Sequence, residues 1–213
     1  MSQKIPWFIK IAVYLIKGKI KTVTGLKNLP SGGAFIIVSN HQSFLDAIFM
    51  HAVIVSYTKR FIYSISKQEL KKTYGQFGHK YLGMLYIDKN NKKKIINTCI
   101  KCLRNNKILV IFPEAKRNYN PNKLLKGKTG AVRLALKTKV PVIPIGLIMP
   151  KGKKVFQLIK NFLFPGRKLE IHIGQAIYFS KYYDKKIDKN TLNNLTKKIM
   201  LAIGKLCRKS YPY

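Results

Sequence analysis

The stretch Ser39-Asn40-His41-Gln42-Ser43-Phe44-Leu45-Asp46 lies where a buried strand is expected to end and a helix to begin. The run before it, residues 34–38 (Ala-Phe-Ile-Ile-Val), is short, apolar and rich in β-branched side chains, which is typical of a strand inside a sheet. Residues 47–55, which follow, are typical of a helix. His41 is therefore expected at the carboxyl end of a strand, where open α/β sheets carry many of their functional sites.

His41 and Asp46 are expected to meet, although a regular helix places residues at this spacing about 140° apart. They can meet only if His41 precedes the helix and folds back over its first turn. The pattern Ser43-x-x-Asp46 provides for this, because it predicts Ser43 at the N-cap and Asp46 at the third helical position. Asp46 is then expected to accept a hydrogen bond from one imidazole nitrogen and to leave the other as a base. On residue types alone, a simple helix cap is the alternative.

Four segments of the chain resemble, in order, the sequence blocks of the glycerolipid acyltransferases. Residues 40–46 resemble N-H-x-S-x-x-D, and residues 83–89 (Gly-Met-Leu-Tyr-Ile-Asp-Lys) resemble G-x-[IL]-[FY]-I-D-R. Residues 112–118 (Phe-Pro-Glu-Ala-Lys-Arg-Asn) resemble F-P-E-G-T-R-S, and residues 140–145 (Val-Pro-Val-Ile-Pro-Ile) resemble V-P-[IV]-[IV]-P-[VI]. The chain is therefore similar to the lysophosphatidate (1-acyl-sn-glycerol-3-phosphate) acyltransferase family over residues 23–179, which is most of its length.

This resemblance implies acyl transfer from acyl-CoA or acyl carrier protein to the free hydroxyl of lysophosphatidate, which makes phosphatidate for phospholipid synthesis. His41 is expected to act as the general base, and Asp46 to orient and stabilise its imidazole. Ser43 is expected to cap the helix rather than to act as a nucleophile. Neither a bound cofactor nor a metal is expected.

The resemblance also implies a site for the phosphate of the acceptor. Arg117 is the expected ligand, because a guanidinium engages two phosphate oxygens at once, and Lys116 adds charge beside it. Residues 126–130 (Lys-Gly-Lys-Thr-Gly) lead into a predicted helix and correspond to a K-x-G block of the family, with Lys128 as a further phosphate contact. Glu114 is expected to hold either Arg117 or the loop. The positions that complete the blocks are Asn40, Ser43, Gly83, Asp88, Pro113, Gly130 and Pro141.

The third block departs from the family pattern at three positions. Ala115 replaces Gly, so the loop is expected to lose the freedom of positive φ, while Lys116 replaces Thr and Asn118 replaces Ser. These departures leave the acceptor open. Another lysophospholipid or glycerol 3-phosphate is an alternative, and so is a relative that has lost activity and only binds lipid.

The net charge of +35, from 42 Lys and Arg against seven Asp and Glu, calls for an anionic partner. An anionic membrane surface or an acidic carrier protein fits the resemblance. A basic nucleic-acid-binding protein is the competing interpretation, but the sequence contains no recognisable RNA- or DNA-binding module. Cys99 and Cys102 share a face of a predicted helix, where they are expected to be small core residues rather than zinc ligands.

Residues 1–21 are expected to form an amphipathic helix at a membrane interface, anchored by Trp7, Lys10 and Lys17. The apolar run is too short to cross a bilayer, so a peripheral location on the cytoplasmic face of the cell membrane is expected. Packing of this helix on the core is the alternative. Residues 22–213 are expected to form a single acyltransferase domain, in which the apolar segment 155–164 fits either the core or a membrane contact.

Strands and helices are expected to alternate, which predicts an α/β fold with a mixed, largely parallel sheet covered by helices on both faces. Pro144 is expected to place its strand at an edge of the sheet or at a bulge. Glycines are expected to break the middle of the helix over residues 68–82. The remaining strands are expected at residues 20–24, 60–65, 85–88, 108–112 and 168–173, and the remaining helices at 92–105, 130–139 and 192–208.

Overall fold

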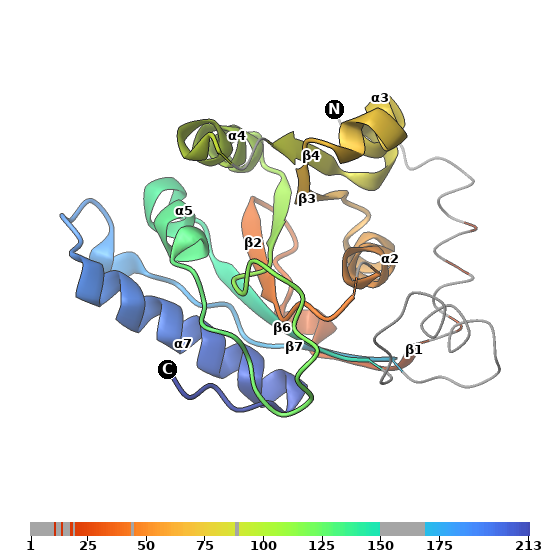
Figure 1. Cartoon of the computed structure of the whole chain (residues 1–213). Helices are drawn as coiled ribbons and strands as arrows, with labels where there is room; N and C mark the ends of the chain where they lie inside the picture. The colour runs from red at the N-terminus through yellow and green to blue at the C-terminus, as the bar shows by residue number, and fades with distance from the viewer. Residues whose placement is uncertain are drawn as a thin grey trace.

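A computed structural model describes residues 20–43, 45–87, 90–149 and 169–213, together with three isolated positions near the N-terminus, Ile11, Tyr14 and Gly18 (Figure 1). The expected interfacial helix, Asp88 and segment 155–164 therefore lie wholly or mostly outside the described residues. The strands are β1 (Ile20–Thr24), β2 (Phe35–Ser39), β3 (Ile62–Lys67), β4 (Met84–Ile87), β5 (Ile108–Ile111), β6 (Val142–Ile148) and β7 (Leu169–Ile173). The helices are α2 (Asp46–Thr58), α3 (Leu70–Leu82), α4 (Lys92–Arg104), α5 (Gly130–Thr138) and α7 (Lys189–Cys207), with short 3-10 turns at Leu26–Asn28 and Ser180–Tyr182.

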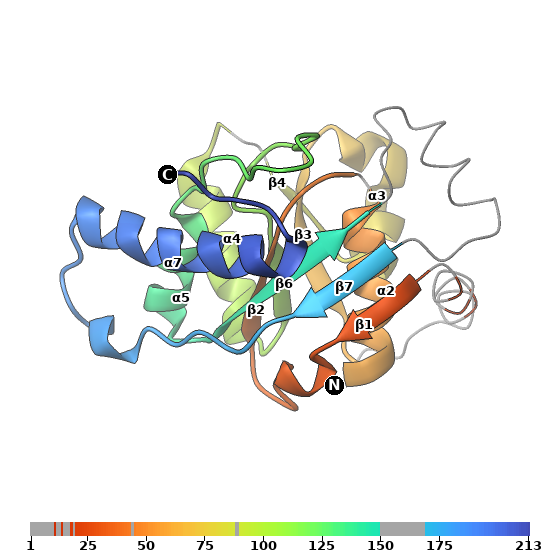
Figure 2. The same cartoon turned by 90° about the horizontal axis from the view of Figure 1, so that it is seen from below.

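The seven described strands form one sheet in the order β1-β7-β6-β2-β5-β3-β4. Neighbouring strands are parallel except for β6 and β7, which are antiparallel, so the predicted mixed and largely parallel sheet is confirmed. Helices α4, α5 and α7 lie over one face and α2 over the other (Figures 1 and 2). Because side chains alternate along a strand, Ile36 and Val38 pack in the first layer while Phe35 and Ile37 pack in the second.

β2 lies near the centre of the sheet, and all five of its residues are buried. It runs parallel to β5, β3 and β4, so the loops that follow these four strands all leave the sheet at the carboxyl ends of the strands. His41 follows β2 and Glu114 follows β5, the strand next to it. The sheet therefore brings the first and third sequence blocks together, as the position of sites in open α/β sheets leads one to expect.

The edge position considered for Pro144 is wrong, because β6 is hydrogen-bonded to β7 on one side and to β2 on the other. The proline lies where the ladder with β7 stops. That ladder pairs Ile145 with Ile173, and pairing resumes between Val142 and Ile177. Between these two pairs the chain advances three residues along β6 and four residues along the segment after β7. Pro144 therefore lies at a bulge-like irregularity, where its missing N–H group is not needed for a hydrogen bond between strands.

Two expectations about helices are confirmed. Gly75 interrupts α3 with φ 47° and ψ −138°, as its glycines suggest. Cys99 and Cys102 of α4 lie in the core, where burial raises the pKa of Cys99 to about 12 and that of Cys102 to about 11. Within the described residues, the helices lack the length and apolar character that crossing a membrane requires.

Candidate active site

The side chains of His41 and Asp46 meet as expected. The imidazole Nδ1 lies 2.8 Å from Oδ2 of Asp46, whose side chain is completely buried. The same oxygen accepts the backbone N–H groups of Gln42 (2.6 Å) and Ser43 (2.9 Å). Three donors on one oxygen compensate for burial of the charge, and they fix the carboxylate relative to the turn that carries His41.

The helix begins later than the capping pattern predicts. α2 starts at Asp46 itself and Leu45 occupies the N-cap position, so the assignment of Ser43 to the N-cap and Asp46 to the third helical position is wrong. The Ser43 hydroxyl instead accepts the N–H of Leu45 at 3.1 Å, which closes a tight turn before the helix. One half of the capping box survives, because the Asp46 carboxylate reaches back to the N–H of Ser43. His41 thus lies before the helix and folds back over its start.

The orientation of the His41 ring is fixed by stacking, and one of its two nitrogens remains without a hydrogen bond to the described residues. It stacks on Phe112 with the ring centroids 4.2 Å apart and the planes at 22°, and 21 % of its side chain is exposed. A carboxylate only accepts, so Nδ1 carries the proton and Nε2 is left with its lone pair. Within the described part of the chain, Nε2 has no hydrogen-bond partner. The sequence reasoning did not identify Phe112 as the stacking partner, although its position directly after β5 was a signal for it.

Glu114 holds the backbone of the site rather than a cation. The residue is only 3 % exposed, and Oε1 accepts the N–H of His41 at 3.0 Å. Oε2 accepts the side-chain amide of Asn118 (2.7 Å) and the N–H of Leu125 (2.8 Å). The structure therefore favours the alternative in which Glu114 holds the loop, since no contact with Arg117 is present among the described side chains. Asn118, which sequence reasoning treated only as a departure from the family, is a buried part of this network.

Asn40 ties the residue before His41 to the neighbouring strand. Its amide nitrogen donates to the carbonyl of Leu147 (2.9 Å), and its amide oxygen accepts the N–H of the same residue (2.8 Å). The buried side chain thus continues the pairing of β2 with β6 beyond the end of β2. His41 is consequently fixed by Asn40 on one side and by Glu114 on the other.

A segment distant in sequence closes over the third block. We call residues 113–128 the Glu114 loop and residues 209–211 the strap. The strap pairs with the loop like a short strand, and two of its side chains add hydrogen bonds, with Lys209 as a donor and Tyr211 as an acceptor. These contacts are Ser210 N–H to Asn122 O (2.8 Å), Leu124 N–H to Ser210 O (2.9 Å), Lys209 Nζ to Asn120 O (2.6 Å) and Gly127 N–H to Tyr211 Oη (3.2 Å). The loop beside His41 is therefore held by residues that follow α7.

The expected phosphate ligands lie on this loop with their side chains in solvent. Lys116, Arg117 and Lys128 are all exposed. The backbone carries them close to the site, because the N–H of Asn118 donates to the carbonyl of His41 at 2.7 Å. Ala115 adopts φ 58°, so the expectation that its loop loses the positive φ is wrong. The hydrogen bonds around Glu114 keep the left-handed turn although an alanine occupies it.

Other block residues are structural or lie elsewhere. Gly83 joins α3 to β4 at φ 63°, and a Cβ there would overlap the carbonyl oxygen of Ile62. Pro141 precedes β6, and its carbonyl accepts the N–H of Ile36 near the start of β2. It therefore lies at the amino ends of the strands, whereas His41 lies at the carboxyl ends. Pro113 is buried and its carbonyl accepts the N–H of Lys128 at 2.9 Å, while Gly130 opens α5.

The chain is similar to known acyltransferases in sequence and in fold. Residues 21–148 match the protein family described as Acyltransferase. The 1-acyl-sn-glycerol-3-phosphate acyltransferase of Helicobacter pylori strain J99 is 39 % identical over 121 residues, which is 54 % of this chain and 49 % of that protein. The protein of the same name from Bacillus subtilis strain 168 is 31 % identical over 157 residues, 72 % of this chain and 75 % of that protein.

The fold agrees with a solved structure. The crystal structure of the 1-acyl-sn-glycerophosphate acyltransferase PlsC from Thermotoga maritima superimposes with a TM-score of 0.66 at 23 % identity, covering 95 % of this chain and 80 % of that one. The matched part of this chain spans about half the length of the Helicobacter pylori relative. The resemblance expected from the four blocks is confirmed, and this chain belongs to the acyltransferase family, with 1-acyl-sn-glycerol-3-phosphate acyltransferases among its relatives.

Proposed function

We propose that this protein transfers a fatty acyl group from acyl-CoA or acyl carrier protein to the free hydroxyl of lysophosphatidate, with His41 as general base. The observation that carries the proposal is the 2.8 Å contact between Nδ1 of His41 and the buried Asp46 carboxylate, which leaves Nε2 as a free base. The names of the Helicobacter pylori and Bacillus subtilis relatives support lysophosphatidate as the acceptor.

In the proposed reaction, Nε2 of His41 removes the proton of the acceptor hydroxyl as its oxygen attacks the thioester carbonyl carbon. The C–O bond forms, and the tetrahedral intermediate collapses with cleavage of the C–S bond. The imidazolium then returns the proton to the departing thiolate. Asp46 stabilises the imidazolium between these steps without taking the proton itself. The amides of Gln42 and Ser43 already donate to Asp46, so other donors must stabilise the oxyanion.

We assign the acceptor phosphate to Arg117, Lys116 and Lys128. Their exposed side chains on the Glu114 loop, next to the backbone of His41, support this assignment. No described acid neutralises these cations in an ion pair. Another lysophospholipid or glycerol 3-phosphate carries the same phosphate chemistry, and these acceptors are the first alternatives.

We also propose that residues 22–213 form one catalytic domain and that residues 1–21 attach it peripherally to the cytoplasmic face of the cell membrane. The charge of +35 supports this location, because lysines near an anionic leaflet contribute about 1 kcal/mol each. A strong positive charge is equally typical of nucleic-acid-binding proteins, which are the competing class. Binding to anionic vesicles rather than to oligonucleotides at matched salt would support the membrane proposal, and the reverse preference would overturn it.

The test is transfer of labelled acyl groups from each donor to lysophosphatidate in vesicles. His41→Ala is expected to reduce transfer by about 10²- to 10⁴-fold with folding intact by circular dichroism. His172→Ala is the matched control, because that imidazole also contacts a carboxylate, Glu170, at 3.2 Å and lies outside the blocks. Transfer unaffected by His41→Ala would overturn the mechanism. No transfer by the wild type would move the search to the other acceptors.

A further inference from the structure

Helix α3 packs loosely on the body of the protein and presents large apolar side chains to solvent. Gly78 is the one residue of α3 that is buried. Leu70 and Tyr74 are 36 % and 40 % exposed and lie one turn apart before the break at Gly75, while Phe77 after it is 49 % exposed. In the described sheet, α3 packs mainly on the edge strand β4 and on its neighbour β3. Such a face is typical of an element that a partner covers.

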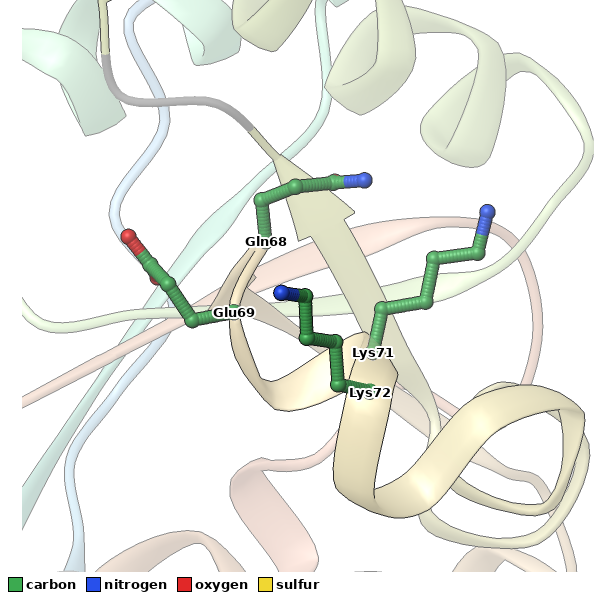
Figure 3. Close-up of a pocket in the computed structure, with 4 residues that line it drawn as sticks. All are labelled: Gln68, Glu69, Lys71 and Lys72. Carbon is green, nitrogen blue, oxygen red and sulfur yellow. The ribbon is translucent and has the colours of Figure 1, made fainter.

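Lysines accompany the apolar side chains. Lys71 and Lys72 are exposed in the first turn of α3 and form no ion pair among the described residues. Figure 3 shows both lysines with Gln68 and Glu69, the four residues that line an open hollow, and the carboxylate of Glu69 points away from Lys71. We name the set Leu70, Lys71, Lys72, Tyr74 and Phe77 the α3 surface. Aromatic and aliphatic side chains beside lysines are typical of helices that lie in a membrane interface.

The α3 surface lies beside the carboxyl edge of the sheet. α3 follows β3 directly, and β3 runs parallel to β5 and shares its sheet with β2, so α3 begins at the edge from which His41 emerges. A lipid acceptor is presented by a bilayer, and a bilayer lying on α3 is close to that edge. This step rests on the proposed function.

We propose that the α3 surface docks on an anionic lipid bilayer, in addition to any contact made by residues 1–21. Lys71 and Lys72 contact the anionic headgroups, and Tyr74 and Phe77 enter the interfacial layer with Leu70. Charge complementarity selects this occupant, because two lysines that form no ion pair with a described residue accompany apolar side chains in a chain of charge +35. A second copy of the chain would carry the same lysines and be repelled by them.

The test is partition of the full chain into equimolar phosphatidylcholine–phosphatidylglycerol vesicles, measured by cosedimentation. Lys71→Gln/Lys72→Gln is expected to weaken partition by about 30-fold, because each lysine contributes about 1 kcal/mol near an anionic surface. Phe77→Gln is expected to weaken it by at least about tenfold. The matched controls are Lys197→Gln/Lys198→Gln on α7, with the same loss of charge, and Tyr178→Gln, another exposed aromatic side chain.

A second measurement keeps the proposal testable if a variant folds poorly. Trp7 is the one tryptophan of the chain, so Phe77→Trp in a Trp7→Phe background reports on position 77 alone. Its emission is expected to shift to the blue with the mixed vesicles and to stay unchanged with pure phosphatidylcholine. An emission that does not respond to the mixed vesicles would overturn the insertion of α3.

Three further results would also overturn the proposal. The lysine controls on α7 lose as much partition as the α3 variants, which would leave net charge as the cause. Phe77→Gln dissociates a dimer without changing partition, which would assign the surface to a second copy. The α3 lysines are needed for an acidic carrier protein and not for vesicles. None of these measurements involves acyl transfer, so vesicle binding through α3 with no transfer to lysophosphatidate or to the alternative acceptors would reject the proposed function and leave this inference intact.

Discussion

Asp46 and Glu114 are both buried carboxylates, in a chain with only seven acidic residues, and they hold different kinds of partner. Oδ2 of Asp46 accepts two backbone amides and the imidazole of His41, while its Oδ1 has no partner among the described residues. Both oxygens of Glu114 accept hydrogen bonds from backbone or side-chain amides. None of these donors titrates near neutral pH.

This difference separates a carboxylate that serves the proposed chemistry from one that serves the architecture. Both fix the turn around His41, one from the side of α2 and the other from the side of the Glu114 loop. Burial alone therefore does not identify a catalytic carboxylate, and the nature of its partner does. If this holds, substitution of Asp46 changes the reaction, and substitution of Glu114 mainly changes stability.

The largest expected effect is on turnover. Asp46→Asn is expected to lower kcat/KM by about 10³- to 10⁴-fold, because an amide no longer fixes the tautomer of His41 or stabilises its imidazolium. Steady-state transfer assays with lysophosphatidate measure it. Glu170→Gln, which removes the carboxylate beside His172, is the control and should leave kcat/KM near the wild-type value. A loss below about tenfold for Asp46→Asn would remove the distinction between the two carboxylates.

Glu114→Gln is expected to lower the free energy of unfolding by roughly 3 kcal/mol or more, because the new NH₂ group faces the donors of Asn118 and Leu125. Urea denaturation measures this change, with exposed Glu69→Gln as control. The pH profile of the remaining activity is expected to keep its shape. A shifted profile with normal stability would give Glu114 a role in proton transfer and break the comparison.

The comparison extends to an imidazole without a carboxylate. Burial lowers the pKa of His51 to about 4, and its Nε2 has no partner in the described structure. In the unfolded chain this imidazole binds a proton with its ordinary pKa of 6.5, whereas in the folded chain it stays neutral down to about pH 4. His51 therefore leaves the free energy of unfolding unchanged above pH 6.5. As the pH falls from 6.5 towards 4, it lowers the free energy of unfolding by up to about 3 kcal/mol. Urea denaturation across this range, with His51→Leu expected to abolish the loss from this group, checks the prediction.

The smallest effect concerns the turn that Glu114 maintains. Ala115→Gly is expected to raise the free energy of unfolding by about 1 kcal/mol, because the native φ of 58° suits glycine better than alanine. Ala202→Gly, at a partly exposed position in the interior of α7, is the control and should destabilise by a similar amount. Thermal or urea unfolding distinguishes them. Equal destabilisation by both substitutions would show that the turn does not depend on its backbone angle.

Sequence patterns predicted the layers of the fold and the meeting of His41 with Asp46 because both depend on local spacing. The alternation of strands and helices predicted the mixed sheet, and the capping pattern placed the two side chains on one turn. The position of Pro144 was only half predicted, because a pattern does not reveal where a neighbouring ladder ends. The roles of Asn40 and Asn118 were missed, since their partners depend on the register of other segments.

The strap has a consequence for the order in which the protein is made. Residues 209–211 leave the ribosome after the whole of the Glu114 loop, yet they supply several of the hydrogen bonds that hold that loop. The ladder between β1 and β7 likewise waits for a strand about 150 residues later in the chain. The Glu114 loop beside His41 is therefore expected to reach its final geometry late in synthesis, and a nascent chain that stops before Lys209 lacks these hydrogen bonds.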